Sequence, residues 1–155
     1  MNNAQLTFKR TDGDDPDFKD FSNKLEKYFN ELVGGEQNRK SFIPYNALGS
    51  IHDVIIASVN GKAVGCASFK EYSENTAEVK RVYVDKAFRR LGIAKQLMEK
   101  LEAAASAKGY RRLILQTREA CTEAVALYKS IGYQIIDNYE PYTNMPLAVC
   151  YEKIL

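Results

Sequence analysis

A basic stretch around a single glycine, Val82 to Lys95, holds the residues of this sequence that are best suited to bind a phosphate. A strand-like run ends there, and a long helical pattern begins at about Gly92. The first turn of a helix presents unpaired N–H groups and the positive end of the helix dipole, which together attract an anion. Glycine lets the backbone approach that anion closely, and Arg89, Arg90 and Lys95 add positive charge around it. The stretch therefore predicts a site for a phosphate or pyrophosphate group.

Two widespread phosphate-binding motifs do not match this stretch. The P-loop requires two glycines at a fixed spacing, followed by Lys and then Ser or Thr, and these residues are missing here. The dinucleotide-binding fingerprint requires three glycines inside a parallel βαβ unit, whereas this stretch has one glycine and follows apparent hairpins. A nucleotide bound in either of these two ways is therefore not expected.

The spacing Arg89-x-x-Gly92-x-Ala94 resembles the acyl-CoA signature of the GNAT superfamily of N-acetyltransferases, Arg/Gln-x-x-Gly-x-Gly/Ala. Taken alone, so short a pattern also fits a basic loop in front of an ordinary helix. In the family, a hydrophobic strand precedes the signature, and a short helix with Leu-Tyr-x-x-x-Gly-Tyr/Phe follows it. The segments 78–84 and 127–133 resemble these two elements and stand in the same order.

The resemblance extends beyond these elements. The segments Phe69–Tyr72, Asn138–Tyr142 and Val149–Lys153 are similar to a group of small bacterial GNAT proteins without an assigned substrate. The resemblance implies an α/β (α+β) fold with a mixed, mostly antiparallel central sheet of about six to seven strands flanked by helices. It also implies acetyl-CoA (coenzyme A) as the cosubstrate.

The resemblance also assigns residues to the cofactor. Backbone N–H groups of the strand before the signature polarise the thioester carbonyl in the family, which corresponds to Val82–Val84 here. Many members carry an Asn where this chain has Cys121, so that contact with the cofactor is in doubt. The residues expected to bind the cofactor are Val82, Tyr83, Val84, Arg89, Arg90, Leu91, Gly92, Ile93, Ala94, Lys95 and Tyr128.

Two side chains match catalytic positions of the family. Acetylation needs a neutral amine, and a nearby carboxylate can take the proton from the ammonium. Glu78 matches the position of the general base in some members, and Glu71 is the second candidate; alternatively, Glu78 is a solvated charge or a structural partner of Lys80 or Arg81. Tyr128 matches the general acid that protonates the leaving thiolate, although it also fits the apolar face of its helix as a core tyrosine.

Other catalytic chemistries have little support in the sequence. His52 is the only histidine and has no evident cysteine partner, which favours direct transfer in a ternary complex over an acyl-enzyme. Cys66 and Cys150 lie in apolar runs and are expected to be buried. No group of His, Cys and carboxylate residues has the spacing of metal ligands, so no metal is expected.

The acceptor is expected to be an amine of a small molecule or a peptide. Residues that could form an acceptor pocket, or simply pack in loops and strand ends, are Tyr45, Asn46, Glu71, Tyr72 and Tyr142. The sequence leaves open which amine is acetylated, whether longer acyl chains are accepted, and whether the chain is a monomer or a homodimer. The alternative function is a non-catalytic acyl-CoA-binding regulatory module with the same fold.

Composition restricts the partners. The chain has 155 residues, of which 45% are hydrophobic, and a net charge of only +2, so a strong electrostatic drive toward nucleic acid is absent. No run of 18 apolar residues predicts a membrane span, and the first ten residues lack a signal-peptide pattern, which together predict a cytoplasmic protein. Without a linker or repeat, residues 1–155 are expected to form one domain.

The elements that must position these residues follow from hydrophobic periodicity and turn signals. Strands are predicted over residues 5–10, 54–59, 63–69, 76–84, 113–117, 133–137 and 148–154, with a tight hairpin turn at Asn60–Gly61. One helix is predicted from Pro16, with Asp15 as its N-cap, to Gly34. A second spans about 92 to 109, and a third begins at the N-cap Thr122 and ends at Gly132.

Overall fold

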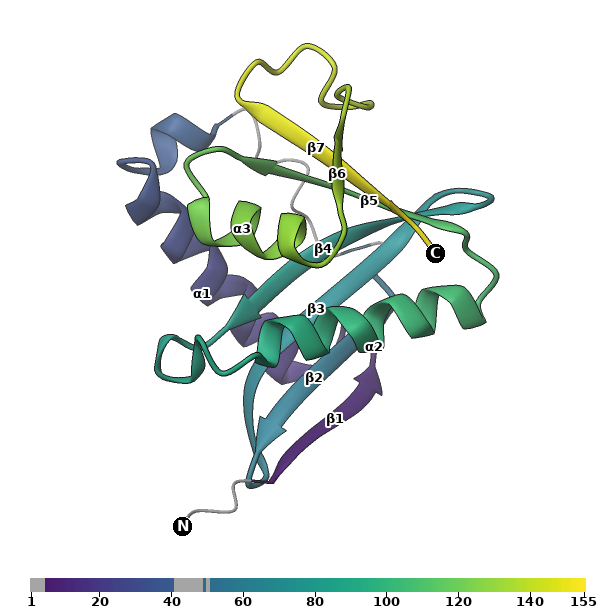
Figure 1. The fold of residues 1–155 in the computed structure, drawn as a ribbon. Coiled ribbons are helices and arrows are strands. Elements are labelled where there is room, and N and C mark those ends of the chain that lie inside the picture. The colour runs from purple at the N-terminus through teal and green to yellow at the C-terminus, as the bar shows by residue number, and fades with distance from the viewer. Residues whose placement is uncertain (1–4, 41–48, 50) are drawn as a thin grey trace.

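A computed structural model describes residues 5–40, 49 and 51–155 of the chain (Figure 1). The described strands are β1 (Leu6–Thr11), β2 (Asp53–Val59), β3 (Lys62–Ser73), β4 (Thr76–Val84), β5 (Arg112–Arg118), β6 (Gln134–Ile136) and β7 (Ala148–Ile154). The helices are α1 (Pro16–Leu32), α2 (Ile93–Ala107) and α3 (Thr122–Ser130), with 3₁₀ turns η1 (Glu36–Arg39) and η3 (Lys86–Phe88).

The described strands form a seven-stranded sheet in the order β1-β2-β3-β4-β5-β7-β6. The pair β4–β5 is parallel, and every other neighbouring pair is antiparallel. The predicted mixed, mostly antiparallel sheet is therefore confirmed. The hairpin turn between β2 and β3 is confirmed as well, because Asn60 and Gly61 both have positive φ, at 51° and 83°.

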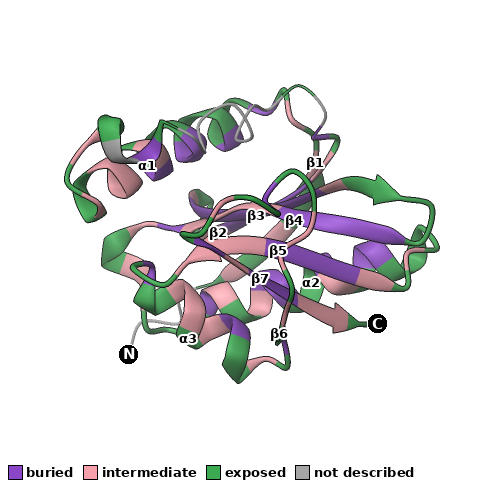
Figure 2. Cartoon of the chain, turned by 90° about the horizontal axis from the view of Figure 1, so that it is seen from above, coloured by how far each residue is buried: buried purple, intermediate pink, exposed green. Residues whose placement is uncertain are grey.

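Two helices cover one face of the sheet and one covers the other. Figure 2 shows α1 on one side and α2 and α3 on the opposite side, with the buried strands between them. Two hydrophobic clusters fill these layers. The smaller cluster packs Phe18 and Phe21 of α1 against β2 and β3, and the larger one packs the buried face of α2, including Leu97 and Leu101, against the central strands.

The helix starts agree with the sequence signals in two of three cases. The Asp15 carboxylate accepts hydrogen bonds from the first turn of α1, as an N-cap does, and Gly92 is the N-cap of α2. The predicted N-cap of α3 was wrong by one residue: Cys121 occupies that position, because its carbonyl accepts the hydrogen bond from the Val125 N–H. Thr122 is the first helical residue.

The bounds of several elements differ from the predictions. Strand β3 continues to Ser73, because Lys70 and the polar residues after it pair with β4 in a hairpin even though they lack a buried face. Strand β6 covers only Gln134–Ile136, where its pairing with β7 begins and ends. The turn η1 lies between residues 34 and 54, where no helix or strand was predicted.

No helix in the described ranges is long and apolar enough to cross a membrane.

Candidate active site

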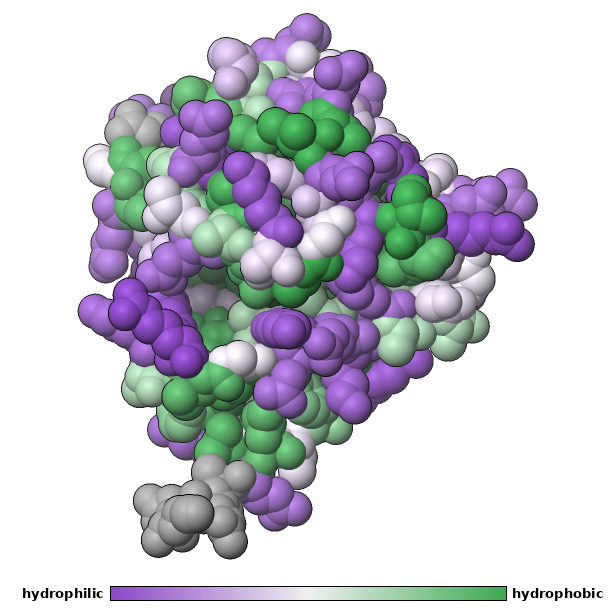
Figure 3. All heavy atoms as spheres, in the orientation of Figure 1, coloured by the Kyte–Doolittle hydropathy of each residue, from purple (hydrophilic) through white to green (hydrophobic). Residues whose placement is uncertain are grey.

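Strands β4 and β5 pair over only three residues and then separate. Their ladder joins Thr76–Glu78 to Arg112–Ile114, and beyond it a cavity of about 530 Å³ is lined by residues 79–84 of β4 and 115–118 of β5. Leu25, Tyr28 and Phe29 of α1 line it from one side of the sheet, and Glu123, Ala124 and residues 126–128 of α3 line it from the other. A ligand in this cavity can therefore contact groups from both faces of the sheet. The space-filling view shows the molecule hollowed between α3 and the start of α2, with hydrophilic side chains at the rim (Figure 3).

The start of α2 forms the basic end of this cavity. Arg89, Arg90, Gly92 and Lys95 all line it. Both Arg90 and Gly92 adopt positive φ, at 65° and 78°, so the chain turns sharply into the helix. No described side chain caps the first turn of α2, which leaves its N–H groups and the helix dipole to a ligand. The backbone donors at the start of α2 are thus open toward the cavity, and anion binding there stays a prediction.

Arg89 is held in place by contacts on three sides. Its Nε donates a hydrogen bond to the Val84 carbonyl at 2.8 Å. Its guanidinium carbon lies 5.3 Å from the centre of the Tyr28 ring and 5.6 Å from that of Tyr83, and Nη1 lies 4.0 Å from a carboxylate oxygen of Glu123. These contacts fix the side chain before a ligand binds, which reduces the entropy lost on binding.

The structure brings ten of the eleven predicted cofactor residues together. The cavity is lined by Val82, Tyr83, Val84, Arg89, Arg90, Gly92, Ile93, Ala94, Lys95 and Tyr128. Leu91 is not among the lining residues, and its side chain is 65% exposed. Cys121, the position at which the sequence left a cofactor contact in doubt, does line the cavity.

A bulge in β4 shapes the middle of the cavity. The register between β3 and β4 shifts between Cys66 and Ser68, and Arg81 adopts a positive φ of 53°. The Ser68 hydroxyl donates to the Lys80 carbonyl, and the Cys66 Sγ donates to the Arg81 carbonyl. Two side chains of β3 thus satisfy the carbonyls that the bulge takes out of the regular ladder.

Tyr128 lies on α3 and lines the cavity with 7% of its surface exposed. Its ring packs edge-on against that of Tyr133, with the ring centres 5.7 Å apart. Burial raises the pKa of the phenol above its ordinary value, so the group stays protonated throughout the pH range of ordinary assays. The hydroxyl is therefore a proton donor at the wall of the cavity.

Glu78 is buried behind the cavity. Its side chain is 3% exposed and does not belong to the lining. The Tyr139 hydroxyl donates to Oε2 at 2.7 Å, and the Lys80 ammonium lies 3.7 Å from Oε1. The partnership with Lys80, one of the alternatives for Glu78, is therefore present, whereas Arg81 pairs with a different carboxylate. A role of Glu78 as general base stays a prediction.

Lys80 connects this buried cluster to the cavity, which it lines. Its ammonium donates to the Tyr142 hydroxyl at 3.1 Å, and Tyr142 is buried. Loss of hydration lowers the pKa of the Lys80 ammonium, and this effect outweighs the opposing effect of the Glu78 charge.

The remaining acceptor candidates lie outside the cavity lining or outside the described residues. Glu71 is exposed, and its carboxylate accepts a hydrogen bond from the Tyr110 hydroxyl. The Tyr72 hydroxyl donates to the Glu140 carbonyl at 2.9 Å. Tyr45 and Asn46 lie outside the described residues.

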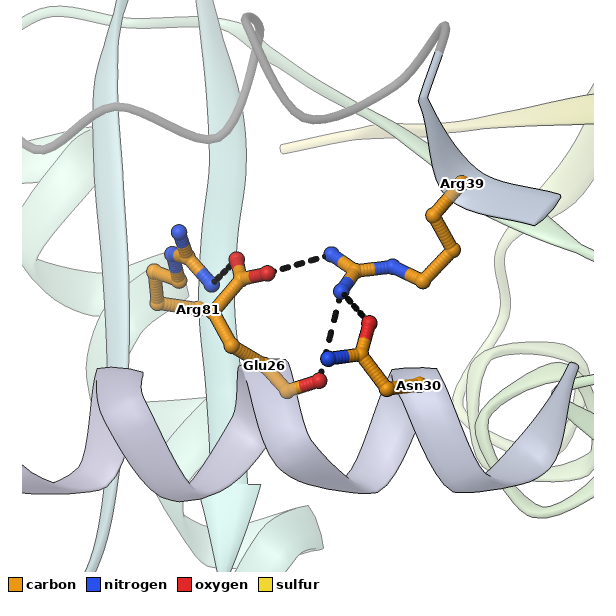
Figure 4. A network of polar contacts seen from close by, with 4 residues as sticks. All are labelled: Glu26, Asn30, Arg39 and Arg81. Carbon is orange, nitrogen blue, oxygen red and sulfur yellow. Dashed lines mark hydrogen bonds and ion pairs between the residues drawn. The ribbon is translucent and has the colours of Figure 1, made fainter. Parts of the chain in front are cut away.

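An ion-pair network on the α1 side of the cavity was not predicted from the sequence. Figure 4 shows Arg39 of η1 and Arg81 of β4 pointing toward Glu26 and Asn30 of α1. Glu26 joins the two guanidiniums, because Oε1 lies 2.6 Å from Arg81 Nη1 and Oε2 lies 2.5 Å from Arg39 Nη2. Arg39 Nη1 also donates to the Asn30 amide oxygen at 2.6 Å and to the Glu26 carbonyl at 3.2 Å. Both arginines line the cavity.

The groups considered for other chemistries lie as follows. His52 is exposed and is not a lining residue. Burial raises the pKa of the Cys66 thiol, whose Sγ donates to a backbone carbonyl. In the described part of the chain, no group of three or more His, Cys, Asp or Glu side chains is placed to hold a metal ion.

Comparison with known proteins extends this picture. Residues 18–133 match the model of the acetyltransferase (GNAT) family. The chain is 30% identical to an IAA acetyltransferase of Azospirillum brasilense over 133 residues, which cover 85% of this chain and 86% of the relative.

Solved structures share the fold along nearly the whole chain. A candidate acyl-CoA N-acyltransferase from Klebsiella pneumoniae subsp. pneumoniae matches with a TM-score of 0.79 and 28% identity, over 97% of this chain and 98% of the other. A GNAT family acetyltransferase from Elizabethkingia anophelis, solved with acetyl-CoA bound, matches with a TM-score of 0.69 and 21% identity, over 97% and 98% of the two chains. The family match and the shared fold together show that this chain belongs to the GNAT family of acetyltransferases.

Proposed function

We propose that this protein transfers an acetyl group from acetyl-CoA to an amine, by direct attack of the amine within a ternary complex. The observation that supports it most is the cavity between β4 and β5, which joins a basic helix start to both faces of the sheet. One ligand can then bring its phosphates to α2 while another approaches from α1. The bound acetyl-CoA in the Elizabethkingia relative is consistent with this assignment.

The residues present fit acetyl-CoA. The ligand carries a pyrophosphate, and the uncapped first turn of α2 with Arg89, Arg90 and Lys95 offers backbone donors and positive charge for it. Its pantetheine arm is long and only weakly polar, and the cavity between the separated strands β4 and β5 offers Leu115 and Val82 among its walls. Bound there, acetyl-CoA would supply an activated acyl group.

The chain's own residues would then handle the protons. The acceptor nitrogen, once neutral, attacks the thioester carbon; the N–C bond forms, the C–S bond breaks, and the proton of the nitrogen must leave. We assign protonation of the departing thiolate to the Tyr128 hydroxyl, which lines the cavity in its protonated form. The proton that the acceptor loses would pass toward Glu78 through Lys80, the neighbouring group that faces the cavity.

The acetyl-CoA assignment is tested by ligand-induced stabilisation. Acetyl-CoA at about 100 times its dissociation constant should stabilise the fold by ~2.7 kcal/mol, which for a chain of this length raises the melting temperature by roughly 5–10 °C. Gly92→Val should abolish this rise, because a branched side chain would stand where the backbone must approach the pyrophosphate. The measurement is a thermal melt of both proteins with and without the ligand.

Gly109→Val provides a matched control for that test. Like Gly92, Gly109 has positive φ and open space where a Cβ would stand, but it follows the end of α2, the opposite terminus from the anion site. Both variants should melt at a lower temperature because of backbone strain. Only Gly92→Val should lose the response to acetyl-CoA; a full response in a folded Gly92→Val protein would contradict the assignment.

Direct transfer predicts that no cysteine is required. The Cys66 thiol is buried with its pKa raised, and Cys150 is buried as well. Cys121 lines the cavity and is the remaining thiol to test. The combined variant Cys66→Ser, Cys121→Ala and Cys150→Ala should keep turnover within roughly tenfold of the wild type, whereas removal of a nucleophile costs orders of magnitude more. Mass spectrometry that detects an acetylated cysteine on the path to product would rule out direct transfer.

A further inference from the structure

The cavity is far more basic than the chain as a whole. Its lining residues include seven basic side chains and one carboxylate, Glu123, although the chain carries a net charge of only +2. Two further carboxylates, Glu26 and Glu78, contact the lining from behind. Among the residues that the structure describes, basic groups therefore outnumber acidic ones by seven to three in and around the cavity.

The cations of the cavity do not all lie where the phosphates of acetyl-CoA would bind. Arg89, Arg90 and Lys95 surround the start of α2, which is the end proposed for the phosphates. Arg39 and Arg81 belong to different elements, the turn η1 and the bulge of β4, and are bound to α1 on the opposite face of the sheet from α2 (Figures 2 and 4). Their charge faces the side from which the acceptor would approach.

The two guanidiniums are held in a fixed arrangement. Glu26 contacts both, Asn30 binds Arg39, and the side chains of Arg39 and Arg81 are only 4% and 8% exposed. In the ion pairs of the described residues, both positive charges face the same carboxylate, that of Glu26, in a poorly hydrated place. Arginine in such a setting binds carboxylates well, because its planar donors match the two oxygens.

From this arrangement we infer that the acceptor is a small amine that carries its own carboxylate, as an amino acid does, and that Arg39 and Arg81 bind that carboxylate. The inference rests on the proposed acetyl transfer and narrows its substrate class. Two consequences follow from the charge. An acceptor with several ammonium groups, such as a polyamine or an aminoglycoside, is repelled. The surrounding cations also lower the pKa of the bound ammonium and so favour the neutral amine that attacks.

The test uses the wild-type protein and matched acceptors. Free thiol release from acetyl-CoA is followed with glycine, alanine, phenylalanine and glutamate, each beside its α-carboxamide, and with a linear diamine. The amine of the amide is deprotonated more easily than that of the amino acid. An enzyme that does not recognise the carboxylate should therefore acetylate the amide faster. We expect kcat/KM for the preferred amino acid to exceed that of its amide by roughly tenfold or more, as expected when a charge-assisted hydrogen bond is lost.

A variant separates recognition from packing. Arg39→Gln should raise KM for the amino acid and bring the ratio of kcat/KM between the acid and its amide close to one, while stabilisation by acetyl-CoA stays near wild type. Loss of activity with both acceptors would indicate a structural role and would overturn the inference. Arg10→Gln, which breaks an exposed ion pair with Asp53 away from the cavity, should keep the wild-type ratio.

The rates of the wild-type protein distinguish failure of the carboxylate preference from failure of the proposed acetyl transfer. Amides or the diamine acetylated as well as the amino acids, in a protein that acetyl-CoA stabilises, would overturn the carboxylate preference and leave acetyl transfer standing. The absence of both transfer and stabilisation would overturn the proposed function and the inference together.

Discussion

Replacing Tyr128 by Phe is expected to slow acetyl transfer by roughly 10²–10⁴-fold in kcat, the range in which a positioned acid or base contributes. The substitution keeps the ring that packs in the core against Tyr133 and removes only the hydroxyl. Affinity for acetyl-CoA should change little, because the hydroxyl acts mainly in the transition state. The measurements are kcat with a good acceptor and the melting shift with acetyl-CoA.

Tyr133→Phe is the matched control. Tyr133 is buried in the same cluster and packs edge-on against the Tyr128 ring, but its hydroxyl donates to Glu102 at 3.1 Å and it does not line the cavity. This variant should lose some stability and keep its turnover. Wild-type kcat in Tyr128→Phe would instead favour the interpretation of Tyr128 as a core tyrosine.

The sequence predicts those parts of the site whose structure is determined by residues that are close together in the chain. Gly92 and the helix after it are visible because a basic loop, a glycine and a helical period follow one another within a few residues. The bounds of β4 agree with the prediction at both ends, because the apolar residues of Thr76–Val84 give a clear strand pattern. Local signals of this kind locate the anion end of the cavity.

The acceptor side depends on contacts between residues far apart in the chain. Glu26 and Arg81 are separated by 55 positions, and no local pattern links them. One signal was available: Lys80 and Arg81 are two adjacent charged residues inside a strand, and they break its alternation where the bulge lies. The bulge explains why both can line the same cavity.

Glu78 illustrates a further limit of sequence reasoning. Its position in the strand agrees with the resemblance, but alternation along β4 cannot tell whether a carboxylate on that face meets solvent, a ligand or a partner. In the structure, the chain after β6 brings Tyr139 to it, 61 positions away. The hydrogen bond and the nearby Lys80 make Glu78 part of a buried polar cluster, so any proton it takes from an acceptor must travel through neighbouring groups.

Removal of the Glu26 carboxylate should have the largest effect on stability among the substitutions considered. Glu26 neutralises two guanidiniums whose side chains are almost fully buried, although its own side chain is 30% exposed. Breaking a buried ion pair from one side leaves uncompensated charge, which costs more than the loss of an exposed pair. The partial exposure of Glu26 lets water compensate some of this charge, so we expect a loss of about 2–3 kcal/mol rather than the full cost of a buried pair.

Glu26→Ala should therefore lower the melting temperature by roughly 5–10 °C in a chain of this length. Glu26→Gln, which keeps an oxygen that accepts hydrogen bonds from the guanidiniums, should lose less. Asp20→Ala is the control in the same helix, because Asp20 forms an exposed ion pair with Lys24 and its removal should cost no more than about 0.5 kcal/mol. If thermal melts place Glu26→Ala within a degree or two of Asp20→Ala, the network contributes little to the fold. We expect the melting temperature to be highest for Asp20→Ala, lower for Glu26→Gln and lowest for Glu26→Ala. This order would show that Glu26 holds Arg39 and Arg81 against α1 through its charge as well as its hydrogen bonds.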